Sequence, residues 1–202
     1  NMHVMITGAA GMLGKKLAAS FAAGAQLRGN AIERLTLVDV VAPSIPVAIR
    51  GYSSTITCDF SGAGIASSLI ETRPDVIFHL AAVVSGEAES NFDLGYRINL
   101  DGTRQLFEAI RLEGRKAPYC PKVIFASSIA VFGAPFPAQI PDDYFTTPLT
   151  SYGTQKAICE LLLSDYTRRG IIDGVGLRLP TICIRPGLPN KAASGFFSHI
   201  LR

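Results

Sequence analysis

Apolar and β-branched residues in this chain gather into six short runs, separated by longer segments of mixed polarity. Runs of about five residues with few polar side chains are typical of strands that are covered on both faces, as parallel strands are. The six strands predicted in this way span residues 4–6, 35–39, 55–59, 76–80, 122–126 and 175–179.

The segments between these runs predict helices over residues 12–23, 64–72, 91–112 and 151–169. A polar loop is predicted at 85–89, a surface loop at 113–121, and a loop with four prolines at 133–150. Regular alternation of strands and helices predicts an α/β fold with a doubly wound, Rossmann-like parallel sheet.

Composition limits the class of protein further. The chain has 202 residues, 48% of them hydrophobic and 17% charged, which is enough for one complete α/β domain. The net charge of +3 comes without a basic run, so no nucleic acid is expected as a partner. No apolar run approaches the ~20 residues of a membrane span, and Asn1-Met2-His3 leads straight into a strand. We therefore expect neither a membrane span nor a signal peptide.

The four cysteines lie far apart and match neither a zinc spacing nor C-x-x-C. We expect free thiols in a reducing cytoplasm, with no metal site. The cysteines are Cys58, Cys120, Cys159 and Cys183.

A glycine-rich stretch directly after the first predicted strand, residues 7–14, has the pattern G-x-x-G-x-x-G. At a strand-to-helix turn, such glycines leave backbone N–H groups and the positive end of the helix facing an open crevice, which suits a pyrophosphate. A plain tight turn is the alternative reading, but the position favours a dinucleotide site. The predicted contacts are Gly8, Gly11, Met12, Leu13 and Gly14.

Asp39 ends the second predicted strand, where a carboxylate accepts hydrogen bonds from both ribose hydroxyls and repels a 2′-phosphate. Val40 and Val41 follow, with no arginine to hold such a phosphate, so NAD is favoured over NADP. A strand-end acid that faces water is the alternative. Asp59 is placed to meet the adenine amino group, although an aspartate that begins a turn is a comparable reading.

Tyr152 and Lys156 carry the strongest catalytic signal. Residues four apart on a helix share a face, and a neighbouring ammonium lowers the pKa of a phenol from about 10 towards neutrality. A pair at this spacing is common on protein surfaces. Ser127 and Ser128, at the end of a predicted strand upstream, favour catalysis because a hydroxyl there can hold the substrate oxygen whose proton Tyr152 removes. Asn99 lies inside the predicted helix 91–112 although asparagine is a poor helix former, so its position calls for a reason other than helix formation. His79, in the predicted strand 76–80, is interpreted as a packed core residue.

Together these elements resemble the extended short-chain dehydrogenase/reductase family, which includes nucleotide-sugar epimerases and dehydratases. The matching elements run in the family's order across nearly the whole chain: the 7–14 glycine turn, Asp39, His79-Leu80-Ala81-Ala82, Asn99-Leu100-Asp101-Gly102-Thr103, Ser127-Ser128, Val131-Phe132-Gly133 and Tyr152-x-x-x-Lys156.

The resemblance implies a role for each matching residue. Ser128 would polarise the reacting oxygen, Tyr152 would be the acid/base, and Lys156 would also hold the nicotinamide ribose. Asn99 would be structural or part of a proton relay. The implied NAD contacts also include Asp59, Leu80, Ala81, Ala82, Asn99, Tyr152, Lys156 and Leu179. A homodimer is expected.

More narrowly, five segments resemble a group in that family that uses NAD to oxidise the C2 hydroxyl of a small sugar acid, D-erythronate, to 2-oxo-tetronate. The segments are residues 83–89, 93–95, 177–182, 185–187 and 189–190. A nucleotide-sugar epimerase or dehydratase with tightly bound NAD is the alternative. A non-catalytic NAD-binding module is a third reading, which the complete Ser128, Tyr152 and Lys156 set disfavours. The expected substrate contacts are Ser85, Ser127, Ser128, Tyr152, Arg185 and Asn190.

Arg185 or its near neighbours are expected to hold the carboxylate, because the planar fork of an arginine makes two parallel bonds to such a group. A surface arginine before Pro186 is the alternative. The family continues beyond Arg202 into a substrate lobe that this chain largely lacks. The expected division is therefore an NAD-binding domain at residues 1–182 and the start of the substrate lobe at 183–202.

Overall fold

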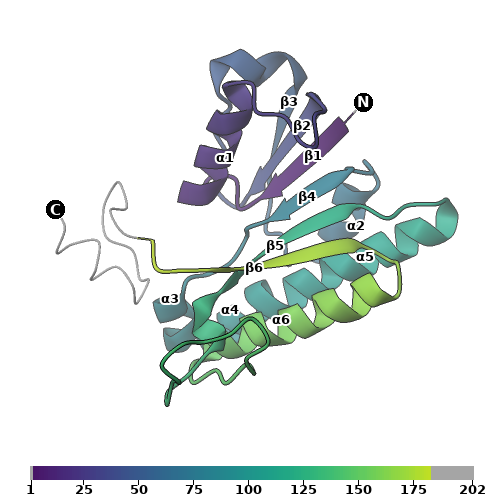
Figure 1. Cartoon of the computed structure of the whole chain (residues 1–202). Coiled ribbons are helices and arrows are strands. Elements are labelled where there is room, and N and C mark those ends of the chain that lie inside the picture. Colours follow the sequence, from purple (N-terminus) through teal and green to yellow (C-terminus); the bar gives the residue numbers. More distant parts are fainter. Residues whose placement is uncertain (1, 183–202) are drawn as a thin grey trace, which may run out of the picture.

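A computed structural model of the chain describes residues 2–182 (Figure 1). Six strands form one parallel sheet in the order β3-β2-β1-β4-β5-β6. This is the doubly wound, Rossmann-like order, so the predicted fold class is confirmed. The strands are β1 Met2–Thr7, β2 Ile32–Asp39, β3 Ser53–Thr57, β4 Val76–His79, β5 Lys122–Ser128 and β6 Asp173–Leu179.

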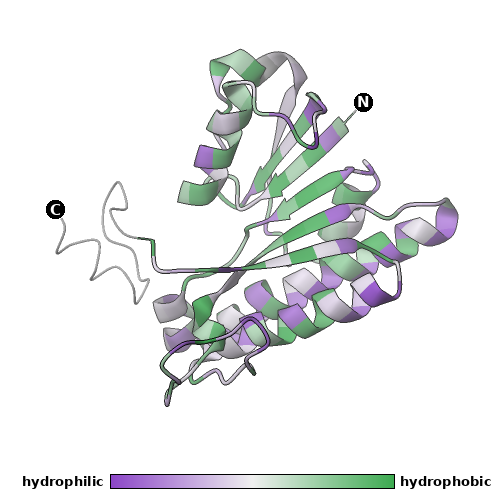
Figure 2. Ribbon diagram, in the orientation of Figure 1, coloured by the Kyte–Doolittle hydropathy of each residue, from purple (hydrophilic) through white to green (hydrophobic). Residues whose placement is uncertain are grey.

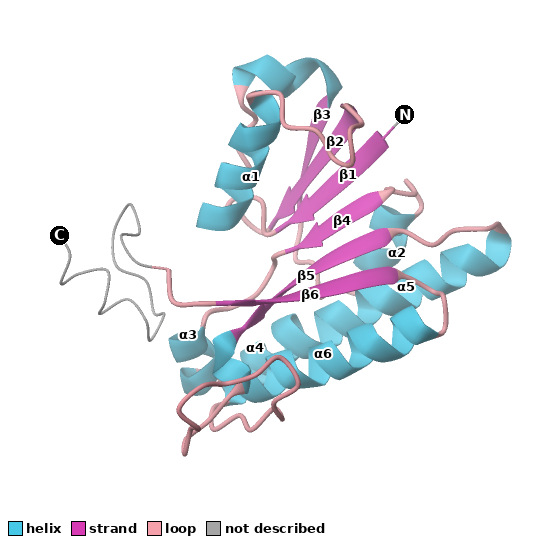
Figure 3. Cartoon of the chain, in the orientation of Figure 1, coloured by secondary structure: helices cyan, strands magenta, loops and turns pink. Residues whose placement is uncertain are grey.

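Helices lie on both faces of this sheet (Figure 3). The α-helices are α1 Met12–Ala22, α2 Ile65–Ile70, α3 Ser85–Ser90, α4 Phe92–Gly95, α5 Gly102–Lys116 and α6 Ser151–Arg168. Two short 3-10 helices, η1 Val47–Tyr52 and η3 Ile129–Val131, and a π-helix, η2 Tyr96–Asp101, complete the described elements.

The alternation of side chains along the strands divides the apolar core between the two faces. On one face, Val4, Ile6 and Leu37 pack with Phe21 of α1. The opposite face buries residues of β1, β4 and β5 against α2, α5 and α6; these include Met5, Ile77, Phe125, Leu69, Phe107, Ile110 and Leu163. The central strands are accordingly hydrophobic along most of their length (Figure 2).

The winding direction reverses between β1 and β4, which are neighbours in the sheet but far apart in sequence. Connections on either side of this point leave in opposite directions, so a crevice opens at the carboxyl ends of the strands. The glycine turn after β1 and the segment after β4 both lie at that edge. The fold therefore gathers the predicted cofactor and catalytic residues in one region.

Three predicted elements differ from those observed. The expected polar loop at 85–89 is helix α3, and the long helix predicted at 91–112 is interrupted by η2 and continues to Lys116. That last turn is stabilised by Glu113, whose carboxylate is 2.9 Å from both Arg73 and Lys116. The third strand lies two residues earlier than predicted, which places Cys58 and Asp59 just beyond its end.

Within residues 2–182, no helix is both long enough and apolar enough to cross a membrane.

Candidate active site

A crevice of about 590 Å³ lies at the carboxyl ends of β1, β4 and β5. Its walls come from the glycine turn, the segment after β4, the end of β5, the first turns of α6, and the chain just after β6. The predicted site residues that line it are Gly8, Gly11, Met12, Leu13, Gly14, Leu80, Ala82, Ser85, Ser127, Ser128, Tyr152, Lys156 and Leu179.

Other predicted site residues either do not line the crevice or lie outside the described part of the chain. Ala81, Asp39, Asp59 and Asn99 are not among the lining residues. Arg185 and Asn190 lie outside residues 2–182, so their assignment to the substrate stays a prediction.

Other residues of the wall were not predicted from the sequence. They are Val83, Val84, Ala126, Ile129, Ala130, Phe132, Phe136, Thr150, Pro180, Thr181 and Ile182. A signal existed for those that directly flank a predicted site residue, such as Ala126, Ile129 and Pro180. Phe136 carries no such signal, because only the path of the loop brings it to the crevice.

The glycine turn is shaped by close backbone contacts. Gly8 has a φ of +73°, and a Cβ there would stand 2.7 Å from the backbone N of Ala81. A Cβ on Gly14 would collide with the backbone of Gly8 and Ala9. Helix α1 begins after Gly11 without a side-chain cap. A pyrophosphate fits such a turn, because it can approach the bare backbone and accept from the first N–H groups of the helix.

Asp39 lies beside this turn at the end of β2. One carboxylate oxygen accepts from the Ala10 N–H at 2.9 Å, and the other accepts from the Val41 N–H at 3.2 Å. The carboxylate therefore fixes the turn, and each oxygen keeps a further lone pair for a ribose hydroxyl.

We expect NAD to bind at least about ten-fold tighter than NADP, a difference of about 1.4 kcal/mol or more, because the Asp39 charge repels a 2′-phosphate. Asp39→Ala should narrow the gap chiefly by weakening NAD, since it also releases the Ala10 N–H. Asp39→Asn keeps one oxygen acceptor but removes the charge, so it should narrow the difference between the NAD and NADP affinities chiefly by strengthening NADP binding. Calorimetry on the full-length wild type and both variants measures all six affinities, and equal wild-type affinities for NAD and NADP would contradict the assignment.

The Asp59 carboxylate is already occupied. One oxygen accepts from the backbone N–H and the hydroxyl of Ser61, at 3.0 and 2.7 Å, and the other pairs with Arg97 at 2.7 Å. The hydrogen bond from Arg97 lowers the pKa of this carboxyl. Its contact with adenine stays a prediction.

Helix α6 brings Tyr152 and Lys156 to the crevice. The Thr150 hydroxyl caps the helix by accepting from the Gly153 N–H at 3.0 Å. Lys156 is 3% exposed. Its ammonium donates to the carbonyl oxygen of Ala126 at 2.7 Å and lies 5.6 Å from the centre of the Tyr152 ring. Burial lowers the pKa of Lys156 to about 8, so the ammonium is still charged at neutral pH.

The two serines at the end of β5 have different environments. Ser128 faces the crevice, and its hydroxyl oxygen accepts from the Ala130 N–H at 3.1 Å. Ser127 is buried, and its hydroxyl donates to Glu160 of α6 at 2.5 Å. Ser128 thus keeps its O–H for a substrate oxygen, whereas the O–H of Ser127 is already used.

Asn99 lies in the π-helix η2 and is 1% exposed. Its side-chain oxygen accepts from the Val83 N–H at 2.9 Å. Its amide group donates to the Val83 carbonyl at 3.2 Å and to the Gln155 side chain at 2.8 Å. Both donors are used, and they tie the crevice wall after β4 to α6. This arrangement supports the structural role over the proton relay.

His79 is buried in the core, as predicted, and its ring links Thr7 of β1 to Thr103 of α5. Thr103 donates its proton to the Asn99 carbonyl at 2.8 Å, so it accepts from His79 Nε2 at 2.9 Å. Nδ1 then accepts from Thr7 at 2.8 Å. Burial lowers the pKa of His79 to about 3, which keeps the ring neutral and this chain of bonds intact.

A doubly wound sheet, a glycine turn after β1 and a Ser128, Tyr152 and Lys156 set across the same crevice define the extended short-chain dehydrogenase/reductase class. NAD is the cofactor named in the description of the family whose model matches residues 4–202. The chain belongs to this family, the NAD dependent epimerase/dehydratase family.

Two curated relatives match this chain over its whole length. D-erythronate dehydrogenase of Cupriavidus necator is 50% identical over 205 residues, and that of Haemophilus influenzae is 46% identical over 204 residues. The chain spans 61% of the length of each relative.

Solved structures share the fold. A nucleoside-diphosphate-sugar epimerase from Agrobacterium tumefaciens is 63% identical with a TM-score of 0.96, over 100% of this chain and 59% of its own. UDP-glucose 4-epimerase from Brucella ovis, in complex with NAD, is 28% identical with a TM-score of 0.69, over 88% of this chain and 51% of its own.

Proposed function

We propose that the protein containing this chain is an NAD-dependent dehydrogenase that oxidises the C2 hydroxyl of a small sugar acid, D-erythronate, to 2-oxo-tetronate. The observation that carries the proposal is the meeting of Ser128, Tyr152 and Lys156 in a single crevice with the glycine turn. The two relatives named D-erythronate dehydrogenase, which match the whole of this chain, support the choice of substrate.

The glycine turn and Asp39 would hold the pyrophosphate and the adenosine ribose of NAD, for the reasons given above. When bound, NAD supplies the nicotinamide that accepts a hydride. Ser128 donates its hydroxyl proton to the substrate C2 oxygen and so orients it. Lys156, charged at neutral pH, favours the phenolate form of Tyr152, and the phenolate oxygen takes the proton of the C2 hydroxyl.

A nucleotide-sugar epimerase is the second candidate. The observation that favours it is the name of the Agrobacterium structure, which is 63% identical to this chain. An epimerase would use the same three side chains, but its NAD would be reduced and reoxidised within each turnover. A non-catalytic NAD-binding module is disfavoured, because binding NAD alone does not require a buried lysine beside a tyrosine and a serine at the crevice.

Free NADH distinguishes the two enzymes. We expect the full-length protein with NAD and D-erythronate to accumulate NADH, measured by its absorbance, and to leave UDP-glucose unchanged. A Tyr152→Phe variant serves as the control for background reduction. Conversion of UDP-glucose with no accumulation of NADH would contradict the dehydrogenase and establish the epimerase.

A further inference from the structure

Helix α6 is hydrogen-bonded to two consecutive residues at the end of β5. Tyr152, Lys156 and Glu160 follow one another at intervals of four, so they share a face of α6. Lys156 donates to the carbonyl of Ala126, and the next residue, Ser127, donates to Glu160. The acidic residue thus continues the catalytic stripe of the helix by one turn.

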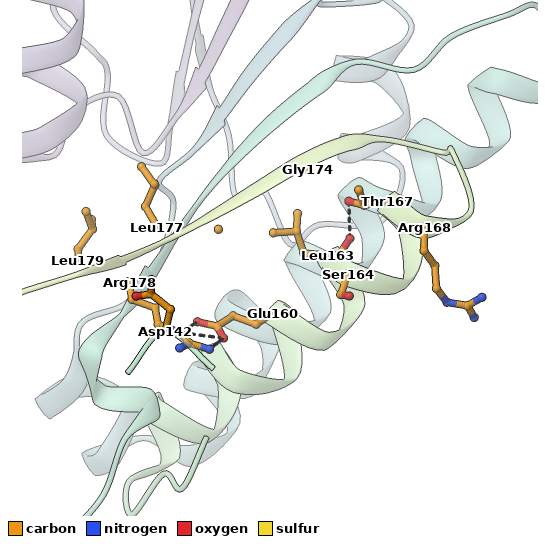
Figure 4. Close-up of a pocket in the computed structure, with 11 residues that line it drawn as sticks. Asp142, Glu160, Leu163, Ser164, Thr167, Arg168, Gly174, Leu177, Arg178 and Leu179 are labelled. Atoms are coloured by element: carbon orange, nitrogen blue, oxygen red, sulfur yellow. Dashed lines mark hydrogen bonds and ion pairs between the residues drawn. The ribbon is translucent and has the colours of Figure 1, made fainter. Parts of the chain in front are cut away.

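Arg178 of β6 holds Glu160 in place. In the parallel pairing, Arg178 lies opposite Ser127. Its Nε is 3.0 Å from one carboxylate oxygen of Glu160, and its Nη2 is 2.8 Å from the other (Figure 4). The guanidinium also lies 4.8 Å from the ring centre of Phe132, which lines the crevice. Bidentate pairing fixes the direction of the carboxylate as well as its charge.

This arrangement determines which way Ser128 faces. Adjacent side chains in a strand point to opposite faces, so the bond that holds the Ser127 hydroxyl on α6 turns Ser128 towards the crevice. The same anchoring fixes the peptide of Ala126, whose carbonyl holds Lys156. One buried contact therefore acts on both neighbours of Ser127.

We propose that Ser127, Glu160 and Arg178 form a positioning unit for the active site, and that the Ser127 hydroxyl does not bind substrate. The unit rests on the proposed function only in that the groups it places are Ser128 and Lys156. It serves any reaction that uses them.

Ser127→Ala in the full-length enzyme should lower kcat about ten-fold, while KM for the acid and the Kd of NAD stay within about two-fold. A misplacement of ~1 Å in a catalytic group can cost up to ~10²-fold in rate. Ser127→Thr retains a hydroxyl and should keep kcat within about three-fold. Glu160→Gln retains an acceptor but loses the charge that Arg178 holds, so its kcat should fall about three- to ten-fold below that of wild type.

Asp165→Asn is the matched control, because it breaks an exposed ion pair with Arg168 on the same helix and should leave kcat unchanged. The kcat of each variant is calculated per NAD-binding site, so that misfolded protein, which does not bind NAD, is excluded from the enzyme concentration. If Ser127→Ala does not fold, the Glu160→Gln variant decides, and a kcat within two-fold of wild type overturns the proposal.

Three other results would overturn it: a Ser127→Ala kcat within two-fold of wild type, a ten-fold rise in KM at unchanged kcat, or a threonine variant no better than alanine. If the wild-type enzyme converts nucleotide sugars but not the acid, the proposed function alone is contradicted. The ratios of variant to wild-type kcat are then measured with the nucleotide sugar as substrate. A wild type that turns over neither substrate contradicts both proposals.

Discussion

Tyr152→Phe should lower kcat of the full-length enzyme by about 10²- to 10⁴-fold, the usual contribution of a general acid or base. The phenol acts on the substrate proton, so the Kd of NAD should change by less than about two-fold. Steady-state kinetics and calorimetry measure the two quantities. Tyr166→Phe is the control on the same helix, because its hydroxyl contacts Glu108 far from the crevice.

A Tyr152→Phe variant that kept more than about a tenth of wild-type kcat would show that another group removes the proton. A large loss of NAD affinity would instead show that the phenol helps to hold the cofactor.

Lys156→Met should abolish most activity and yet stabilise the NAD-free protein at neutral pH. In the folded state burial lowers the pKa of Lys156 to about 8, whereas its ordinary value is 10.5. Between these two values the unfolded chain binds more protons, so the contribution of this group to stability rises with pH. At pH 7 the whole cost of burying the charge is present. Methionine removes that cost but also the bond to Ala126, so the net gain should be about 1–3 kcal/mol.

Urea unfolding of the NAD-free protein between pH 7 and 10 tests this expectation. The advantage of Lys156→Met should shrink above pH 8, as wild type loses its buried charge. Lys16→Met, which removes an exposed lysine of α1, should follow the wild-type curve. Parallel curves for wild type and Lys156→Met would show that the buried ammonium costs the fold little.

The strand pattern could be predicted from the sequence because it is local. Buried parallel strands need continuous apolar runs, and the end of each run placed Asp39, Ser128 and the glycine turn at one sheet edge. Helix α3 could not be predicted in this way, since its residues look like a polar loop. Tertiary contacts hold it: Ala88 is fully buried, and Glu89 accepts from the Ser151 N–H at 3.0 Å.

The candidate site shows the same division between local and distant causes. The spacing of Tyr152 and Lys156 defined that pair directly. The π-helix around Asn99 depends on Val83 and Gln155, far away in sequence, and the unfavourable asparagine in a predicted helix was its only signal. The contacts that connect Ser127 through Glu160 to Arg178 could not be predicted for the same reason, because they form only when β5, β6 and α6 are assembled.

The position of Arg178 has a consequence for dynamics. Among residues 2–182, β6 stands at one end of the strand order and pairs with β5. It includes Gly174 and Gly176, which add no side chain to the packing against Leu163. A strand with little apolar packing opens locally at a lower free energy than a well-packed strand and exchanges its amide hydrogens faster. Each opening that carries Arg178 away removes the two bonds that orient Glu160. The free energy of opening β6 therefore sets an upper limit on the fraction of molecules in which the active site is fully assembled.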